Sequence, residues 1–215
     1  MEGLINGIIN IDVAILQFFV DNVHNPVLDV IMKILTMFGE GGIFWIAVCV
    51  VCMAFPKTRK IGFTMAIAML LGFAIGNGII KNVVARHRPY ELAQFSAFPI
   101  VKKLSDWSFP SGHTLASFEA AVSIFCWRKK WGAAALALAL CVAVSRIYLI
   151  VHYPSDVIAG ALLGTAFALV AFFIIKTLYT KYDLDSRLLF RFEKERAKKS
   201  SASAAKTEEA GNSGE

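Results

Sequence analysis

Three apolar segments of about twenty residues each most constrain the fold of this chain. They run from Ile61 to Ile80, from Trp131 to Val151 and from Ser155 to Leu178. A helix needs about 20 apolar residues to cross the hydrocarbon core of a bilayer. The composition agrees, because 57% of the 215 residues are hydrophobic and only 18% are charged, whereas soluble domains carry about 25% charged residues. The sequence therefore predicts an all-α integral membrane protein.

Three further apolar segments extend this prediction to a bundle of six membrane-spanning helices. Two of them are shorter than a span, and we expect each to continue into its flanks. The three segments are Pro26–Phe38, Ile43–Phe55 and Pro110–Trp127. Residues 85–109 between the spans are polar and aromatic, and too irregular to cross lipid.

The two ends of the chain differ from the bundle in composition. Residues 4–20 are apolar but interrupted by Asn6, Asn10 and Asp12, which is typical of a helix lying at the membrane interface. The last residues are first basic and then rich in Ser, Ala, Glu and Gly, which indicates disorder. We expect three parts: an N-terminal interfacial segment at 1–24, a six-span membrane domain at 25–180 and a cytoplasmic tail at 181–215.

Lysine and arginine indicate the orientation of the bundle. The formal net charge of +6 does not indicate nucleic-acid binding, because the cations gather at the ends of apolar segments. Alternation of six spans puts three of these groups on one side, which the positive-inside rule makes cytoplasmic. They lie at 57–60, 128–130 and 181–199. Both termini are then predicted to be cytoplasmic, in a multi-pass protein of the cell membrane.

Three polar motifs lie where spans meet connections on the opposite, extracytoplasmic side. They are Lys81 to Arg88-Pro89, Pro110-Ser111-Gly112-His113, and Ser145-Arg146 followed by His152 and Asp156. Their residues and spacing resemble the three-part signature of the type 2 phosphatidic acid phosphatase superfamily at every defining position. The resemblance covers residues 81–156 in motifs and about 25–178 in architecture, and it leaves the tail out.

The residues of these motifs suit phosphoryl transfer, which depends on positioning and on positive charge around the phosphoryl oxygens. Lys81 and Arg88 are seven residues apart, so one face of a helix would present both if the helix continued that far. The Pro110–His113 segment indicates a helix start, where Ser can cap and free N–H groups bind anions. His152 and Asp156 are four apart, so the carboxylate can orient the imidazole as a nucleophile.

The resemblance also implies a role for each motif residue. It implies that His152 forms a phosphohistidine, that Asp156 orients it, and that His113 protonates the leaving oxygen and then activates water. It implies that phosphate is held by Lys81, Arg88, Ser111, Gly112 and Arg146. It implies no metal and no other cofactor.

Other polar residues near the motifs leave alternatives open. Arg86 and His87 lie at variable positions of the first motif, where contacts to lipid headgroups and to substrate are equally compatible with the sequence. Glu119 lies in an apolar segment six residues beyond His113, and ionisable groups in such segments are costly and often functional. Glu119 is therefore a candidate for tuning the site.

The predicted activity is that of a lipid phosphate or diphosphate phosphohydrolase working at the outer leaflet. Among such enzymes, undecaprenyl diphosphate phosphatase is favoured, and phosphatidylglycerophosphate or phosphatidic acid phosphatase is the alternative. The motifs do not separate these, because they bind phosphate and not the lipid tail. A soluble vanadate-binding haloperoxidase is disfavoured by the apolar segments. A non-catalytic lipid-binding scaffold or transporter is disfavoured by the complete set of motif residues. The expected partners are a lipid phosphate and the membrane, with no nucleic acid; the sequence indicates no protein partner.

Overall fold

The computed structural model describes residues 2–96 and 104–182, and within these ranges the chain is helical, with no strand. Turns of 3-10 helix join some of the α-helices, and one nine-residue stretch is π-helix, labelled η2. The elements are α1 (Glu2–Asn22), α2 (Pro26–Met37), η1 (Glu40–Gly42), α3 (Ile43–Ala54), α4 (Arg59–Leu71), η2 (Gly72–Ile80), α5 (Lys81–Val84), η3 (Pro89–Glu91), η4 (Ala93–Phe95), α6 (Gly112–Trp127), α7 (Lys129–Tyr148) and α8 (Pro154–Tyr182).

The chain divides into two compact units, residues 1–173 and 174–215. All elements discussed below belong to the first unit, which contains α8 as far as Phe173. Most of the predicted tail at 181–215 lies outside the described residues, since the description ends at Tyr182.

Four helical stretches in the described ranges are long and apolar enough to cross a membrane. They are Pro26–Ala54, Arg59–Glu91, Lys129–Tyr148 and Pro154–Tyr182. The first unites α2 and α3, which the sequence analysis counted as two spans, and α6 has only 16 residues. The helical class of the fold is thus confirmed, whereas the number of six spans and the interfacial position of α1 stay predictions.

Two glycines separate α2 from α3. Gly41 and Gly42 have φ angles of 57° and 68°, in the left-handed region that glycine adopts without steric cost. At the other end of α2, Asn25 caps the helix by accepting a hydrogen bond from the backbone N–H of Leu28, and Pro26 fills the first turn. The pair α2–α3 is therefore a helix with a sharp bend built into its sequence.

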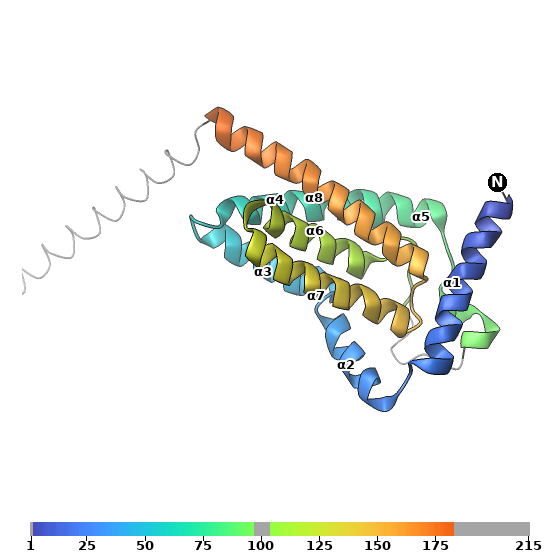
Figure 1. Ribbon diagram of the computed structural model, residues 1–215. Helices are drawn as coiled ribbons and strands as arrows, with labels where there is room; N and C mark the ends of the chain where they lie inside the picture. Colours follow the sequence, from blue (N-terminus) through green and yellow to red (C-terminus); the bar gives the residue numbers. More distant parts are fainter. Residues whose placement is uncertain (1, 97–103, 183–215) are drawn as a thin grey trace, which may run out of the picture. The chain divides into compact units, whose positions relative to one another are not determined.

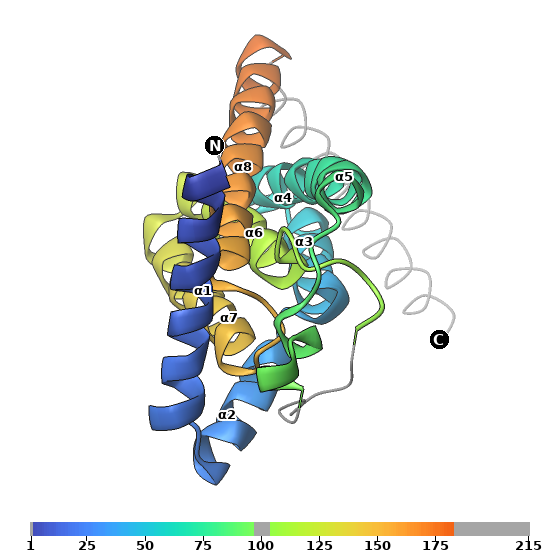
Figure 2. The same cartoon turned by 90° about the vertical axis from the view of Figure 1, so that its right-hand side faces the viewer.

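The helices α3, α4, α6, α7 and the first part of α8 run side by side, and α1 crosses the end of this bundle (Figure 1, Figure 2). Trp45 of α3, Met65 of α4 and Ala120 of α6 form one part of its core. The close approach of α8 to α6 depends on Gly160 and Gly164. A Cβ atom at either position would lie 2.8 Å from the Ser111 carbonyl oxygen or 2.6 Å from that of Leu115.

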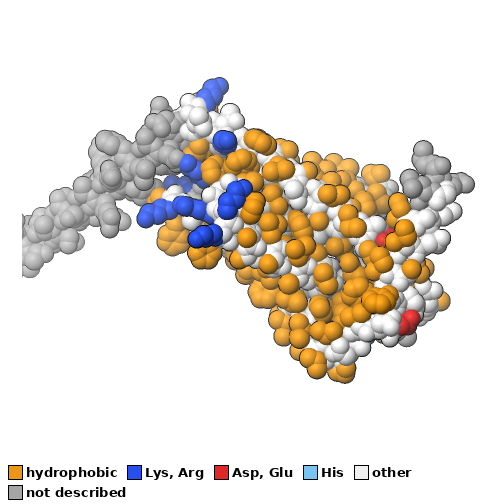
Figure 3. All heavy atoms as spheres, in the orientation of Figure 1, with side chains coloured by type: hydrophobic (Ala, Val, Ile, Leu, Met, Phe, Trp, Pro, Cys, Tyr) orange, Lys and Arg blue, Asp and Glu red, His pale blue; other side chains and the backbone are white. Residues whose placement is uncertain are grey.

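The surface of the first unit is apolar along the helices. Large side chains such as Val50, Phe73 and Leu162 are exposed there by 60%, 73% and 67%, which is the pattern of a surface that meets lipid rather than water. Lysine and arginine gather at the end where α3 joins α4 and α6 joins α7 (Figure 3). The connections after α5 and α7, which carry the polar motifs, lie at the opposite end (Figure 1).

Candidate active site

Lys81 and Arg88 reach the same site from different backbone conformations. The helix that carries Lys81 ends at Val84, because Ala85 adopts a left-handed conformation with φ of 46°. Arg88 follows in extended backbone, with φ of −83° and ψ of 153°. The helix does not continue as far as Arg88, so the two cations do not share one helix face. The reversal at Ala85 turns Arg88 back toward Lys81, and both side chains are buried.

Asp106 joins the two cations and was not anticipated from the sequence. Its carboxylate accepts hydrogen bonds from Lys81 Nζ at 2.5 Å and from Arg88 Nη2 at 2.6 Å, and its carbonyl oxygen accepts from Arg88 Nε at 2.8 Å. Burial opposes ionisation of this carboxyl, but the hydrogen bond from Lys81 and the charges of Lys81 and Arg88 outweigh it and lower the pKa of Asp106 to about 2. A carboxylate thus binds the two donors that the family resemblance assigns to phosphate.

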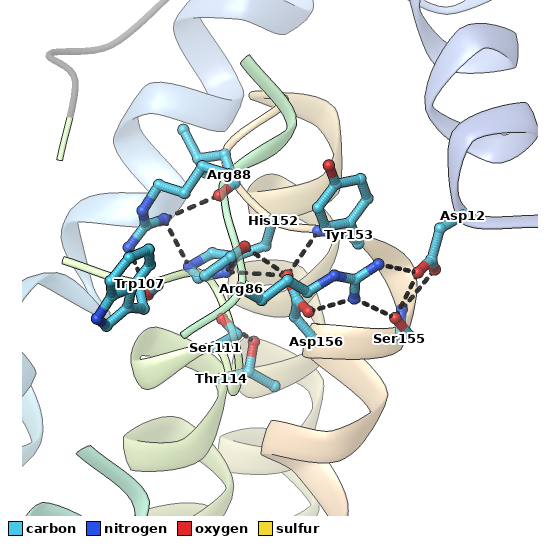
Figure 4. A network of polar contacts seen from close by, with 12 residues as sticks. Asp12, Arg86, Arg88, Trp107, Ser111, Thr114, His152, Tyr153, Ser155 and Asp156 are labelled. Carbon is cyan, nitrogen blue, oxygen red and sulfur yellow. Dashed lines mark hydrogen bonds and ion pairs between the residues drawn. The ribbon is translucent and has the colours of Figure 1, made fainter. Parts of the chain in front are cut away.

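His152 lies in the connection between α7 and α8 with both ring nitrogens in contact with polar groups (Figure 4). Arg88 Nη1 donates toward Nε2 at 3.2 Å, and Ser108 Oγ lies 3.3 Å from Nδ1. Since Ser108 donates its own proton to Asp156, the Ser108 oxygen accepts the Nδ1–H of the imidazole. The network therefore assigns the proton to Nδ1 and leaves the lone pair on Nε2.

Burial is the first cause that keeps His152 neutral. The side chain is 1% exposed. This burial, followed by the charges of Arg88, Arg146 and Lys81, lowers the pKa of His152 well below its ordinary value. An imidazole with a low pKa keeps its Nε2 lone pair at neutral pH, which is the state required of a nucleophile.

Asp156 stands behind His152 in the first turn of α8 and is fully buried. Its Oδ2 accepts from Ser108 Oγ at 2.5 Å and from the backbone N–H of Tyr153 at 3.0 Å, and it lies 3.6 Å from Nδ1 of His152. At 3.6 Å the carboxylate and imidazole form an ion pair when His152 is protonated but no direct hydrogen bond. Ser108 bridges them, so the predicted orienting pair is a group of three.

The Pro110–His113 segment begins α6, as predicted. Ser111 occupies the N-cap position, but its side chain makes no capping hydrogen bond; it accepts one from Thr114 Oγ1 at 3.0 Å instead. Its backbone N–H donates to the carbonyl oxygen of Asp156 at 3.1 Å, which ties α6 to α8. A Cβ atom at Gly112 would lie 3.9 Å from Lys81 Nζ, so the free N–H groups of this helix end lie beside the cation.

His113 and Arg146 come from the first turn of α6 and the last turn of α7. A Cβ atom at Gly39 would approach within 2.9 Å of His113 Cδ2, so the backbone at Gly39 packs against this imidazole. Arg146 is buried, and its Nη1 donates to Thr36 Oγ1 of α2 at 2.5 Å. Its Nε has no hydrogen-bond partner within residues 2–96 and 104–182, so part of this guanidinium is uncommitted.

A cavity of about 700 Å³ begins at this cluster and continues between α3, α4, η2 and α6. Its polar end is lined by five predicted site residues: Lys81, Arg88, Gly112, His113 and His152. The other three, Ser111, Arg146 and Asp156, are not among the lining residues and lie behind them. The walls away from this end are apolar, and they include Ile46, Val50 and Phe73.

Glu119 also lines the cavity, on the apolar part of its wall. The side chain is 2% exposed, and Oε1 has no partner in the part of the chain that the structure describes. The missing side chain of Gly72 gives it room, since a Cβ atom there would clash with the carboxyl group. No three His, Cys, Asp or Glu side chains within 2–96 and 104–182 lie close enough together to hold a metal ion.

Comparisons with known proteins indicate the family of the chain. The profile of the PAP2 superfamily matches residues 57–179. An undecaprenyl-diphosphatase of Sulfolobus acidocaldarius is 34% identical over 75% of this chain and 78% of its own. A lipid A 4'-phosphatase of Bacteroides thetaiotaomicron is 27% identical over 85% of each chain. The crystal structure of a transmembrane PAP2-type phosphatidylglycerolphosphate phosphatase of Bacillus subtilis is 26% identical, with a TM-score of 0.63 over 82% of this chain and 88% of that one.

The chain belongs to the PAP2 superfamily of phosphatases and is an enzyme of that class. The apolar helices and the membrane relatives make it a membrane protein.

Proposed function

We propose that this protein is a metal-independent lipid phosphate or diphosphate phosphohydrolase that works through a phosphohistidine on His152. The observation that carries the proposal is the state of His152. At the polar end of the cavity its Nε2 accepts a hydrogen bond from Arg88, which a bound phosphoryl group would replace, and its Nδ1–H donates to Ser108. A neutral, oriented imidazole next to fixed cations has what an in-line attack on a phosphoryl group requires.

The proposed reaction has two steps. The phosphoryl oxygens take the donors of Lys81 and Arg88 and the N–H groups at the start of α6, which replaces the contacts to Asp106. Nε2 of His152 attacks the terminal phosphorus, the bond from this phosphorus to its bridging oxygen breaks, and His113 gives that oxygen a proton as it leaves with the lipid monophosphate (from a diphosphate) or the lipid alcohol (from a monophosphate). His113 then takes a proton from water, and the hydroxide displaces His152 to release inorganic phosphate.

Arg146, Ser111 and Asp156 support this reaction from behind the cavity wall. Arg146 adds positive charge near the phosphoryl group while Thr36 holds its Nη1. Ser111 sets the start of α6, and its N–H binds the carbonyl oxygen of Asp156. Asp156 and Ser108 stabilise the positive charge that develops on the imidazole during attack.

The favoured substrate is undecaprenyl diphosphate. The relative of that activity in Sulfolobus acidocaldarius supports it by covering most of both chains, and the long apolar cavity wall suits a chain without polar groups. Phosphatidylglycerophosphate or phosphatidic acid is the alternative, supported by the Bacillus subtilis structure. A lipid-binding scaffold or transporter would not need the His152, Ser108 and Asp156 arrangement.

The proposed organisation follows the charge pattern of the sequence. Six spans at 25–180 cross the cell membrane, both termini and the tail at 181–215 are cytoplasmic, and the segment at 1–24 lies at the interface. The active site is extracytoplasmic, at the end away from the cationic connections. The gathering of lysine and arginine at the other end of the first unit supports this orientation (Figure 3).

A panel of lipid phosphates tests the function directly. Purified protein in detergent with a chelator is given undecaprenyl diphosphate, phosphatidylglycerophosphate, phosphatidic acid and lysophosphatidic acid, and released phosphate is measured. We expect the highest kcat/KM with the prenyl diphosphate. A higher value with phosphatidylglycerophosphate would favour the alternative, and a strict requirement for a divalent metal would overturn the mechanism.

Replacing Asp106 by asparagine should strengthen the binding of phosphate. The carboxylate competes with phosphate for Lys81 and Arg88, and asparagine keeps its shape without its charge. We expect the inhibition constant of inorganic phosphate to fall about threefold to tenfold, because the variant loses the two partly exposed ion pairs of Asp106 that compete with phosphate. Asp21→Asn, which changes an exposed acid on α1, should leave it unchanged. Weaker phosphate binding in Asp106→Asn would show that Asp106 positions the cations instead of competing.

The same pairing has a pH dependence whose sign follows from the lowered pKa. The pKa of Asp106 is about 2 in the folded protein against an ordinary value of 3.8. The ion pairs therefore contribute their full stability above the ordinary value and lose it as the pH falls toward 2. The competition with phosphate should persist across the whole neutral range.

A further inference from the structure

A second polar network lies next to His152 (Figure 4), and its residues Asp12, Arg86, Ser155 and Asp156 do not line the cavity. Its centre is Arg86, whose guanidinium lies between two buried carboxylates. Nη1 donates to Oδ1 of Asp156 at 2.6 Å, and Nη2 donates to Oδ2 of Asp12 at 2.7 Å. Asp12 is 2% exposed, and Asp156 is fully buried. Arg86 does not line the cavity, so it does not contact the phosphate that binds there.

Asp12 ties helix α1 to the start of α8. Besides Arg86, it binds both donors of Ser155: Oδ1 accepts from the backbone N–H at 2.9 Å, and Oδ2 accepts from Oγ at 2.5 Å. That N–H belongs to the first turn of α8, where backbone donors lack partners within the helix. Leu16 of the same helix packs with Phe95, Ile150 and Tyr153. Asp12 thus fixes the N-terminal helix to Ser155 after the His152 connection, and Leu16 packs against Ile150 before it.

Arg86 decides which oxygen of Asp156 faces the nucleophile. It occupies Oδ1, and this leaves Oδ2 to Ser108 and to the Tyr153 N–H. The guanidinium itself is held in plane, because it stacks on the Tyr153 ring at 3.8 Å and also donates to Ser155 Oγ at 2.7 Å. A buried carboxylate that lost this partner would have an unsatisfied oxygen and could rotate away from Ser108.

The charges of Asp12, Arg86 and Asp156 also indicate that Arg86 holds Asp156 in place. Asp12 and Asp156 carry two negative charges, and Arg86 supplies one positive charge between them. Buried charges are costly unless they are paired and hydrogen-bonded. Asp12 also shares the guanidinium, so Arg86 does not neutralise Asp156 completely. Asp156 thereby keeps negative charge for the imidazolium that forms at His152.

We propose that Arg86 and Asp12 are positioning residues of the phosphatase reaction: Asp12 of α1 holds Arg86, and Arg86 holds Asp156 in the orientation that Ser108 and His152 require. The inference rests on the proposed function of His152 and extends the catalytic machinery to the N-terminal helix. Neither residue contacts the reacting atoms, and both act through Asp156.

Three variants test this positioning role: Arg86→Leu, Arg86→Lys and the isosteric Asp12→Asn. We expect Arg86→Leu to lower kcat about 100-fold, the size of a misplaced catalytic group, with KM changed less than about twofold. Arg86→Lys should recover about tenfold of that loss, because an ammonium pairs with one carboxylate without matching both. Asp12→Asn should lower kcat by about tenfold. Asp21→Asn on α1 and His87→Gln beside Arg86, both at exposed positions, are the matched controls and should keep wild-type kcat.

A double variant separates positioning from general loss of structure. If Asp12 acts through Arg86, adding Asp12→Asn to Arg86→Leu should not lower kcat further. If the two residues acted independently, the fold losses in kcat would multiply. Thermal unfolding in detergent and inhibition by inorganic phosphate report folding and the phosphate-binding groups. Should Arg86→Leu fail to fold, Arg86→Lys takes its place in the same comparison.

Two outcomes would overturn the inference. One is a wild-type kcat in Arg86→Leu; the other is a loss that appears in KM and phosphate inhibition instead of kcat. The wild type is measured alongside with the lipid panel. Turnover that survives in Arg86→Leu removes this inference alone, while a wild type that turns over no lipid phosphate removes the proposed function and the inference with it.

Discussion

Replacing His152 by alanine is expected to abolish turnover, with a loss of at least about 10⁴-fold in kcat, as for a removed covalent nucleophile. The reason is specific to this residue. Its Nε2 carries the lone pair at the polar end of the cavity, and Lys81 and Arg88 are placed to hold a phosphoryl group against it. In the variant, these cations should still bind phosphate, but no nucleophile is present to attack phosphorus.

The measurement combines turnover with binding. Released phosphate gives kcat, and protection from thermal unfolding by inorganic phosphate or orthovanadate shows that the anion site remains. We expect His152→Ala to keep that protection and to lose acid-labile labelling of the protein by a ³²P-labelled substrate. His87→Ala, at an exposed position, is the control and should keep both. Normal turnover in His152→Ala would remove the proposed nucleophile.

Replacing His113 by alanine is expected to slow a different step of the reaction with each kind of substrate, because the need for a proton donor depends on the leaving group. With a lipid monophosphate such as phosphatidic acid, whose leaving group is an alkoxide, the missing proton donor should lower kcat by about 10²- to 10⁴-fold. With an activated aryl phosphate, whose phenolate leaves without a proton, the first step should remain fast. The second step still needs a base for water, so the phosphohistidine should accumulate.

Rapid-mixing kinetics checks this division of roles. In His113→Ala, an aryl phosphate should give a burst close to one phenolate per protein, followed by slow turnover. Quenched samples should contain labelled protein that the wild type does not accumulate. If the aryl and lipid substrates lost activity equally and no burst appeared, His113 would be a structural or phosphate-binding residue instead of the acid and base.

Much of the site could be predicted because its residues lie at helix ends. The length of the apolar segments predicted the long helices, and the motif residues lie at the ends of those segments. Gly112 and His113 stand where an apolar segment begins, which predicted their place in a first helical turn. The spacing of His152 and Asp156 likewise predicted their proximity. These inferences need only local geometry, which a sequence carries.

The residues that were missed are placed by contacts between distant segments. Asp106 and Ser108 lie in an irregular connection, where no period indicates the direction of a side chain. The sequence placed residues 85–109 outside the helices, so the end of the helix before Ala85 agrees with it, but the direction in which the left-handed turn at Ala85 sends Arg88 was not predicted. Asp12 was noticed, but as a mark of an interfacial helix. A polar residue that interrupts an apolar segment has the same signature whether it faces water or a buried ion pair.

The close packing of α6 against α8 also decides from which direction a lipid reaches the site. Gly160 and Gly164 bring the two backbones together, and the Ser111–Asp156 hydrogen bond joins them at the catalytic end. These contacts close the space between α6 and α8 at Gly160 and Gly164. On the other side, Ile46, Val50 and Phe73 line the cavity and are also exposed on the apolar surface. Under the proposed function, a lipid substrate would therefore reach the site from the bilayer, past α3 and η2.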